Sequence, residues 1–355
     1  MTENKNNTLY YMVDSDQSFC VNRQTEDGEQ IVYALNYFQI IDRIFRESDI
    51  NMLTGKLVGD PPVSPSVMAG LFGFENEAKR FPYRCSLSGE HDHAACLRNF
   101  CQRLNAFFSG EHLTRRTYYQ YRNGPRETVP ARTIYPGNYV VNGEGLKYVI
   151  PFGYLRLRMS GPTAGRLIAA EIKDRFVSVN LPHMHRRTSP GGVKSDFRPG
   201  VELAENKGGK VIDLSDEFER QFFGDLMLFT AEALVKQVDV KQPFPEDAIL
   251  ALLQKREAEL LALYQQKHQS IRQKSKQLRA LVFEDDHWWL RDESLKGPLK
   301  EVAAFIDTLE HNFGETSRAW LQIQSSAHRE RRKRQILEAL VNYRSERDAW
   351  DELFL

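Results

Sequence analysis

The sequence has no run of eighteen apolar residues, and it has only four cysteines among 355 residues. A membrane-spanning helix needs about 20 mostly apolar residues, so we expect no such helix and no membrane partner. Four cysteines are too few for a disulfide framework, which favours a reducing, cytoplasmic setting. The opening stretch, MTENKNNTLYYMVD, also lacks the basic and apolar regions of a secretory signal peptide.

The common catalytic motifs are missing as well. The sequence contains no G-x-x-x-x-G-K-[ST], no H-E-x-x-H and no G-x-S-x-G. The stretch NGEGLKY has two glycines of a dinucleotide-binding pattern but not the third, and a turn explains it. We therefore predict no cofactor and do not assign a reaction.

Cysteine and histidine are concentrated in residues 85–101, CSLSGEHDHAACLRNFC. A structural zinc site needs four N or S ligands, commonly in closely spaced pairs. The spacing here lacks paired ligands, and Cys101 lies on the apolar side of a helix predicted near 94–108. We favour buried thiols over a metal site, whose candidate ligands would be Cys85, His91, His93 and Cys96.

The net charge of zero conceals an uneven distribution along the chain. Residues 1–111 carry a net charge of −5, residues 112–210 carry +10, and residues 211–355 carry −5. A charged partner responds to the local field rather than to the total. The middle segment therefore indicates a polyanionic partner.

Arginine and tyrosine alternate closely in this middle segment. Arginine makes bidentate contacts with phosphate, and tyrosine offers a flat face on which unpaired bases can stack. Basic residues continue into a Gly- and Pro-rich stretch after residue 185. The predicted nucleic-acid-binding residues are Arg115, Arg116, Tyr118, Tyr119, Arg122, Arg126, Arg132, Tyr154, Arg156, Arg158, Arg186, Arg187, Lys194 and Arg198.

The stretch GYLRLRM alternates between polar and apolar residues, which predicts a strand. Tyr154, Arg156 and Arg158 would then share one exposed sheet face. A helix over TAGRLIAAEIKDRF and a strand at VSVNLP follow, so 147–181 is predicted to form a βαβ unit. A unit with an Arg/Tyr face resembles, at the level of the fold, the RRM-type domains found in RNA-guided complexes.

The remaining periodicity completes an α+β prediction. A mixed sheet and helix body is expected over 1–182, with RRM-like βαβ elements. A mobile basic loop or extended hairpin is expected over 183–212, and an all-α bundle or long helical hairpin over 213–355. Within the all-α part, helices are expected from 246 to about 282 and over about 298–313, and a helix after Ser215 would carry on one side Phe218, Phe222, Leu226, Phe229 and Ala233. Near the N-terminus, a helix over 33–48 would present Leu35, Phe38, Ile41 and Phe45 on its apolar side.

The helical part carries two basic stretches, at 265–279 and 325–335. If the long helices are antiparallel, the two stretches could lie side by side and form one basic tip. A single helix is expected over about 316–352, and these helices are the predicted contact with other protein subunits. The secondary basic patch comprises Lys274, Lys276, Arg279, Arg329, Arg331, Arg332 and Arg334.

The favoured function is a non-catalytic subunit of a multi-component, bacterial-type assembly that binds RNA or single-stranded DNA. One alternative is a metal-independent nuclease, in which His183 or His185 acts as the acid or base and arginine stabilises the phosphorane. The other alternative is a scaffold subunit whose long helices bind proteins.

Overall fold

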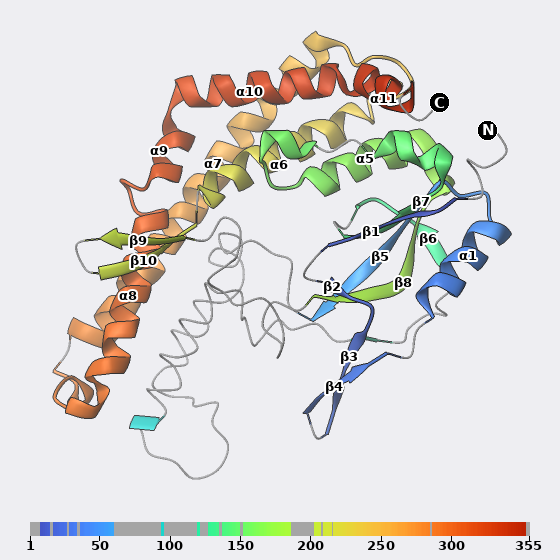
Figure 1. Ribbon diagram of the computed structural model, residues 1–355. Coiled ribbons are helices and arrows are strands. Elements are labelled where there is room, and N and C mark those ends of the chain that lie inside the picture. The colour runs from blue at the N-terminus through green and yellow to red at the C-terminus, as the bar shows by residue number, and fades with distance from the viewer. Residues whose placement is uncertain are drawn as a thin grey trace.

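The computed structural model shows a sheet with helices on both faces, joined to a long helical region (Figure 1). The described residues are 8–14, 17–26, 28–33, 36–59, 94–95, 119–120, 127–134, 137–149, 152–185, 202–206, 209–214, 216–284 and 286–352.

The N-terminal body is built on one mixed sheet. Its strands are, in spatial order, β1 (Tyr10–Val13), β7 (Asn138–Val141), β5 (Met52–Gly59), β8 (Phe176–His185) and β2 (Gln17–Ser18), with β6 (Thr128–Pro130) also paired to β8. β5 is parallel to β8, with an irregularity between Thr54 and Lys56, and the other pairs are antiparallel. β2 and β6 therefore share the outer edge of β8.

Two further hairpins lie outside this sheet. β3 (Val21–Thr25) pairs with β4 (Gly28–Val32), and β9 (Glu202–Asn206) pairs with β10 (Gly209–Asp213). The second hairpin lies inside the stretch expected to be a basic loop or extended hairpin. β8 also continues to His185, three residues beyond the predicted end of the body.

One helix covers each face of the sheet (Figure 1). On one face, α1 (Tyr37–Glu47) buries Tyr37, Ile41 and Ile44 against the strands, and the Asn36 side chain caps it by accepting a hydrogen bond from the Gln39 N–H at 3.2 Å. On the other face, α5 (Ser160–Ile172) packs its apolar side against β5, β7 and β8.

The predicted βαβ unit is wrong. The strand that precedes α5 is β7, and the chain between them forms two 3-10 helices, η2 (Gly143–Tyr148) and η3 (Phe152–Leu155). β7 is separated from β8 by β5 and runs antiparallel to β5. The parallel partner of β8 is therefore a strand more than 100 residues earlier, which local periodicity does not indicate.

The C-terminal part is entirely helical after β10, so the fold is α+β as predicted. Its core is continuous with the core beneath α5, because α6 packs on α5. Its helical elements are α6 (Glu217–Leu234), α7 (Glu246–Arg279), η6 (Ala280–Glu284), η7 (Trp288–Leu290), η8 (Glu293–Leu295), α8 (Lys296–Phe313), α9 (Arg318–Gln324), α10 (Ser326–Val341) and α11 (Tyr343–Glu352). In the sheet body, a short 3-10 helix, η4 (Lys173–Arg175), follows α5.

The single helix expected over 316–352 is in fact three helices. Ser325 has extended backbone angles and its hydroxyl accepts a hydrogen bond from the His328 N–H, so it ends α9 and caps α10. The helix ends again at Asn342, which is the C-cap of α10. These two interruptions of the helix let α11 turn back onto the sheet body (Figure 1).

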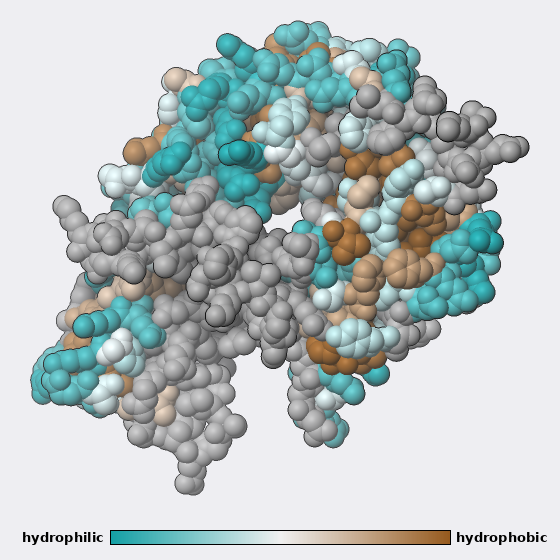
Figure 2. Space-filling model, viewed as in Figure 1, coloured by the Kyte–Doolittle hydropathy of each residue, from teal (hydrophilic) through white to brown (hydrophobic). Residues whose placement is uncertain are grey.

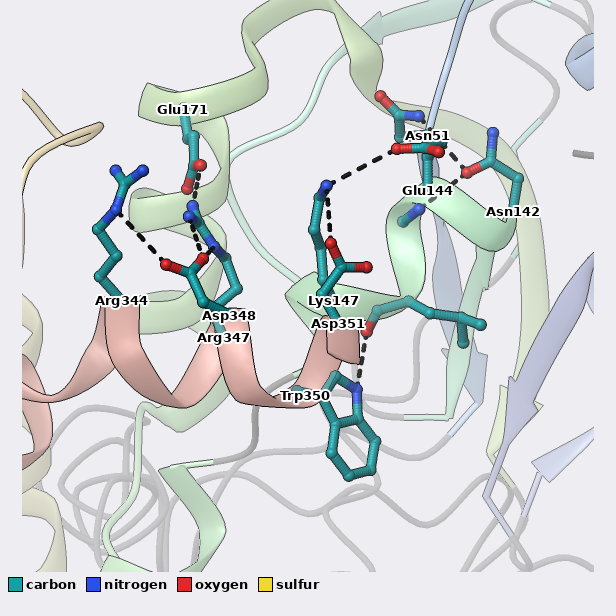
Figure 3. A network of polar contacts seen from close by, with 12 residues as sticks. Asn51, Asn142, Glu144, Lys147, Glu171, Arg344, Arg347, Asp348, Trp350 and Asp351 are labelled. Carbon is teal, nitrogen blue, oxygen red and sulfur yellow. Dashed lines mark hydrogen bonds and ion pairs between the residues drawn. The ribbon is translucent and has the colours of Figure 1, made fainter. Parts of the chain in front are cut away.

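Figure 3 shows how α11 is attached to the body. Arg347 pairs with Glu171 of α5, and Lys147 of η2 pairs with Asp351 at 3.4 Å. The Trp350 indole N–H donates to the Leu146 carbonyl at 3.0 Å. The helical region is therefore fixed to the sheet body at its C-terminal end as well as through α6.

In the described chain, no helix combines the length and the apolar character needed to cross a membrane.

Candidate functional site

The stretch GYLRLRM is not a strand. Phe152–Leu155 is a 3-10 turn and Arg156 has a left-handed backbone (φ 53°). The alternation of polar and apolar residues nevertheless predicted which side chains are buried, because Leu155 and Leu157 are buried whereas Tyr154 and Arg156 are exposed. The packing of α6 against this stretch explains why its backbone is not extended.

α6 contacts this stretch at three points. The Arg220 guanidinium donates to the Arg156 carbonyl at 2.6 Å, and the Arg158 N–H donates to the Arg220 carbonyl at 3.1 Å. A Cβ on Gly224 would lie only 2.3 Å from the Arg158 carbonyl oxygen, so glycine permits this approach. Because α6 occupies these backbone groups, the stretch cannot join a sheet ladder.

Two of the predicted binding arginines pair with acidic residues of the helical region. Arg158 pairs with the buried Glu217 at 2.5 Å, and Arg132 pairs with Glu232 at 2.8 Å. Arg158 is half-buried, whereas the Arg132 side chain is 64% exposed. These contacts give both guanidiniums a structural role between the sheet body and α6.

The two basic stretches of the helical region do not form one tip. In the second stretch, Arg329 and Lys333 of α10 pair with Glu257, near the start of α7. In the first, Arg279 pairs with Asp307 of α8 at 3.4 Å. The prediction is wrong because the C-terminal half of α7 packs against α8, not against α10.

The basic residues of these stretches differ in exposure. Arg332 pairs with the buried Glu219 at 2.7 Å, and its side chain is 19% exposed. Arg331 is exposed and contacts the His328 ring at 2.6 Å. Lys276 and Arg334 are also exposed, and Lys274 is half-buried.

The Arg/Tyr-rich block comprises residues 114–135, of which 119–120 and 127–134 are described. Tyr119 and Gln120 lie along the outer edge of β8. The Tyr119 N–H donates to the Asn22 carbonyl at 2.8 Å, and the Asn180 side chain donates to the Gln120 carbonyl at 3.2 Å. Asn180 lies between the residues of β8 that pair with β6 and those that pair with β2. The block is therefore anchored in the gap between these two short strands.

The other predicted residues of the middle segment, and the candidate zinc ligands, lie outside the described residues. They are Arg115, Arg116, Tyr118, Arg122, Arg126, Arg186, Arg187, Lys194, Arg198, Cys85, His91, His93 and Cys96.

His183 and His185 lie within β8 rather than in a loop, and both are buried. The Tyr11 hydroxyl lies 2.6 Å from His183 Nε2, and the Gln17 amide oxygen lies 3.3 Å from Nδ1. Burial lowers the pKa of His183 to about 4, so the ring is neutral at pH 7. A neutral imidazole has one donor and one acceptor nitrogen, and this pair of partners matches both.

Asn138 extends this buried polar group. Its amide donates to the carbonyls of Lys56 and Leu181, at 2.6 and 2.9 Å, and its oxygen lies 3.2 Å from the Tyr11 hydroxyl. The two carbonyls belong to β5 and β8 at the irregularity in their pairing. Asn138 therefore satisfies backbone groups that the ladder leaves unpaired.

An aromatic cluster surrounds His183 on the α1 face of the sheet. The centroid of the His183 ring lies 4.6 Å from the ring centroid of Phe19, 5.3 Å from that of Tyr37 and 5.4 Å from that of Tyr11. The Tyr37 hydroxyl donates to the Pro182 carbonyl at 2.6 Å. We define the aromatic cluster as Tyr11, Phe19, Tyr37, Phe38 and His183.

The Arg/Tyr-rich block adjoins this cluster. Burial raises the pKa of Tyr37, and the neighbouring Cys20 and Tyr119 raise it further. Tyr119 also packs against the small core of Cys20, Val21, Val58 and Met184. The anchored segment thus lies beside the buried side of the aromatic cluster.

Sequence analysis missed this cluster and misassigned Phe38. The predicted apolar side of α1 included Phe38, but its side chain is 67% exposed, whereas Tyr37 beside it is buried. Phe19 is 37% exposed. The stretches YYM, SFC and NYF contain the tyrosines and phenylalanines, but only the fold brings them together with His183, because Phe19 and Tyr37 are 18 residues apart and His183 lies more than 140 residues further along the sequence.

Comparison of the chain with protein-family models, with curated proteins and with solved structures finds no match.

Proposed function

We propose that this protein binds RNA or single-stranded DNA through its middle segment, residues 112–210, as a non-catalytic subunit of a multi-component, bacterial-type assembly. The segment carries a net charge of +10 between two segments of −5 each. A field of this kind steers a polyanion toward the middle of the chain.

The observation that carries the proposal is the anchor at Tyr119 and Gln120. The hydrogen bonds to Asn22 and Asn180 hold this part of the block on the outer edge of the sheet. Four arginines lie within six residues of Tyr119 and Gln120 in the sequence: Arg115, Arg116, Arg122 and Arg126. A fixed edge of the sheet next to a basic segment suits a nucleic-acid backbone, which needs several cations in register.

The ion pairs of Arg132 and Arg158 limit which arginines can be the main phosphate contacts. Both guanidiniums already contact carboxylates of α6, which neutralise part of their charge and leave fewer N–H donors for phosphate. Tyr154 and Arg156 are exposed and remain candidate contacts. We therefore assign the main phosphate contacts to the arginines around the anchor, with Arg186, Arg187, Lys194 and Arg198 as additional candidates.

Exposed apolar side chains of the helical region motivate the second part of the proposal, which is contact with other subunits. Leu321 of α9 is 53% exposed and Leu263 of α7 is 43% exposed. These side chains would meet protein partners, which also keeps the scaffold alternative open. The low cysteine content supports a cytoplasmic setting.

The nuclease alternative has little support. His183 is fully buried and neutral at pH 7, and aromatic rings and polar partners surround it. A general acid or base must come within hydrogen-bond reach of the scissile group. We therefore assign His183 a structural role in the aromatic cluster.

Binding of labelled 15-nucleotide RNA and DNA single strands, followed by fluorescence anisotropy, tests the proposal. We expect binding at about 100 mM salt that weakens steeply as salt increases, because phosphate contacts release counterions. Changing Arg115, Arg116, Arg122 and Arg126 together to Glu should abolish binding. The matched control changes the exposed Arg331 and Arg334 to Glu and should retain most of the affinity.

Two results would contradict the proposal. The first is wild-type protein that binds neither strand at about 100 mM salt. The second is a quadruple variant that folds and binds like the wild type. Cleavage of the strand in EDTA would instead support the metal-independent nuclease.

A further inference from the structure

Two phenylalanine rings of the aromatic cluster reach the protein surface. Phe38, in the first turn of α1, is 67% exposed, and Phe19, which follows β2, is 37% exposed. Their ring centroids lie 5.5 Å apart with an interplanar angle of 39°. Figure 2 shows hydrophobic side chains at the surface over the sheet, on the side next to α1.

The rings of Phe19 and Phe38 pack against the tyrosines of the aromatic cluster. Phe19 contacts Tyr11 and Tyr37 edge to face, with centroids 5.5 and 5.3 Å apart, and Phe38 contacts Tyr11 edge to face at 6.3 Å. Tyr11 and Tyr37 are fixed in turn by the hydrogen bonds to His183 and to the Pro182 carbonyl. The buried polar group therefore gives the two exposed rings a defined position before any ligand binds.

We propose that Phe38 and Phe19 form a stacking site for an unpaired base of the single strand whose phosphates the middle segment binds. This inference rests on the proposed function. A flat ring stacks on any base, so the site would discriminate single strands from duplexes without selecting a sequence.

Size and location favour a nucleic-acid base over a protein as the occupant. Stable protein interfaces bury about 800 Å² on each partner, far more than two phenylalanine rings provide. The charged residues of α1 cancel, because Asp42 pairs with Arg46 and Arg43 pairs with Glu47. The positive charge that a strand requires lies in the neighbouring segment anchored at Tyr119.

The test compares two single strands of equal length, a 15-nucleotide oligo-dT and its fully abasic counterpart. Both carry the same phosphates, but only the first has bases to stack. We expect the wild type to bind oligo-dT more tightly than the abasic strand. Phe38→Ala should lower the affinity for oligo-dT by roughly 5- to 150-fold, the range for one stacked base, and leave abasic binding unchanged.

Two variants act as controls. Phe38→Trp keeps an aromatic face and should retain the affinity for oligo-dT. Trp288→Ala removes a 49% exposed aromatic side chain from the connection between α7 and α8 and should change neither affinity. Because Phe38 is largely exposed, Phe38→Ala should fold normally, which circular dichroism checks.

The possible results separate the two proposals. If the wild type binds neither strand, the proposed function is wrong and the stacking site falls with it. If the wild type binds both strands equally, or if Phe38→Ala binds oligo-dT as Trp288→Ala does, only the stacking site is overturned. In either of the last two cases, the exposed rings of Phe38 and Phe19 would instead be assigned to a contact with a protein.

Discussion

In the sheet body the buried polar side chains are amides, hydroxyls and imidazoles, whereas in the helical region several are carboxylates and one is a guanidinium. Among the described residues, the buried charged side chains are Glu217, Glu219 and Asp225 of α6 and Arg347 of α11. The sheet instead buries Asn138, Thr54, His183 and similar neutral groups. Asn138 and His183 are satisfied by hydrogen bonds between uncharged groups, whereas Glu219 and Arg347 are satisfied by ion pairs.

The difference follows from the geometry of the two regions. Strands leave isolated carbonyls at irregular pairings, and a short amide such as Asn138 reaches two of them. Helices bring long side chains of opposite charge together from several elements, as with Glu219 between His328 and Arg332 of α10. A charge buried in this way is costly unless its partners remain, so the two regions should respond differently to mutation and pH.

The largest expected effect is from Glu219→Gln. This change keeps the shape but leaves Arg332 and His328 without their carboxylate, at a cost of about 3 kcal/mol in the free energy of unfolding. Urea denaturation followed by circular dichroism measures it. The control is Asp42→Asn, which breaks an exposed ion pair with Arg46 and should cost less than about 0.5 kcal/mol. Equal effects of the two changes would remove the contrast between buried and exposed charges.

Asn138→Ala should have a smaller effect. It leaves the carbonyls of Lys56 and Leu181 without their donor, at a cost of about 1–3 kcal/mol. Because the amide is uncharged, the cost should be the same at pH 6 and pH 8 in urea denaturation. The exposed Gln24→Ala serves as the control. A cost that varied strongly with pH would indicate that charged groups also depend on this site.

The smallest effect, and the one that refines the comparison, is from Asp225→Asn. Burial raises the pKa of Asp225, although the Tyr264 hydroxyl donates to it at 2.6 Å and Gln221 donates at 2.8 Å. The folded protein therefore binds this proton more tightly than the unfolded chain, and the ionised carboxylate is a burden at pH 7.

Asparagine removes that charge and keeps an acceptor for Tyr264. We expect Asp225→Asn to increase the free energy of unfolding at pH 7. The advantage should shrink as the pH falls through the raised pKa, where the wild-type carboxyl becomes protonated. Urea denaturation at pH 7 and pH 4 measures it. A variant less stable than the wild type at pH 7 would contradict a net cost of this buried carboxylate.

Helix prediction from the sequence was accurate where one apolar side persisted over many turns. The pattern from residue 246 predicted α7, and 298–313 predicted α8, each within three residues of the observed ends. Phe218, Phe222, Leu226 and Ala233 are buried on α6 as expected. Phe229, predicted on the same side, is 37% exposed because it faces the outer side of the α6–α7 pair.

The candidate site was less predictable. Charge counting identified the middle segment, but it could not show that Arg132 and Arg158 pair with α6. The residue pattern placed His183 at the start of a loop. In the structure β8 continues through His183 to His185, because β2 pairs with the outer edge of β8 at Met184 and His185. The aromatic cluster combines residues of β1, β8, α1 and the end of β2, and no local pattern links them.

Local sequence was enough to predict the α+β composition, the positions of α7 and α8 and the uneven charge, because periodicity and composition are properties of neighbouring residues. The arginines that pair internally, the phenylalanines that reach the surface and the parallel pairing of β5 with β8 became apparent only in the tertiary structure. These outcomes depend on contacts between residues far apart in the chain. Their energies arise when apolar surface is buried and polar groups must find partners, which happens only in the assembled fold.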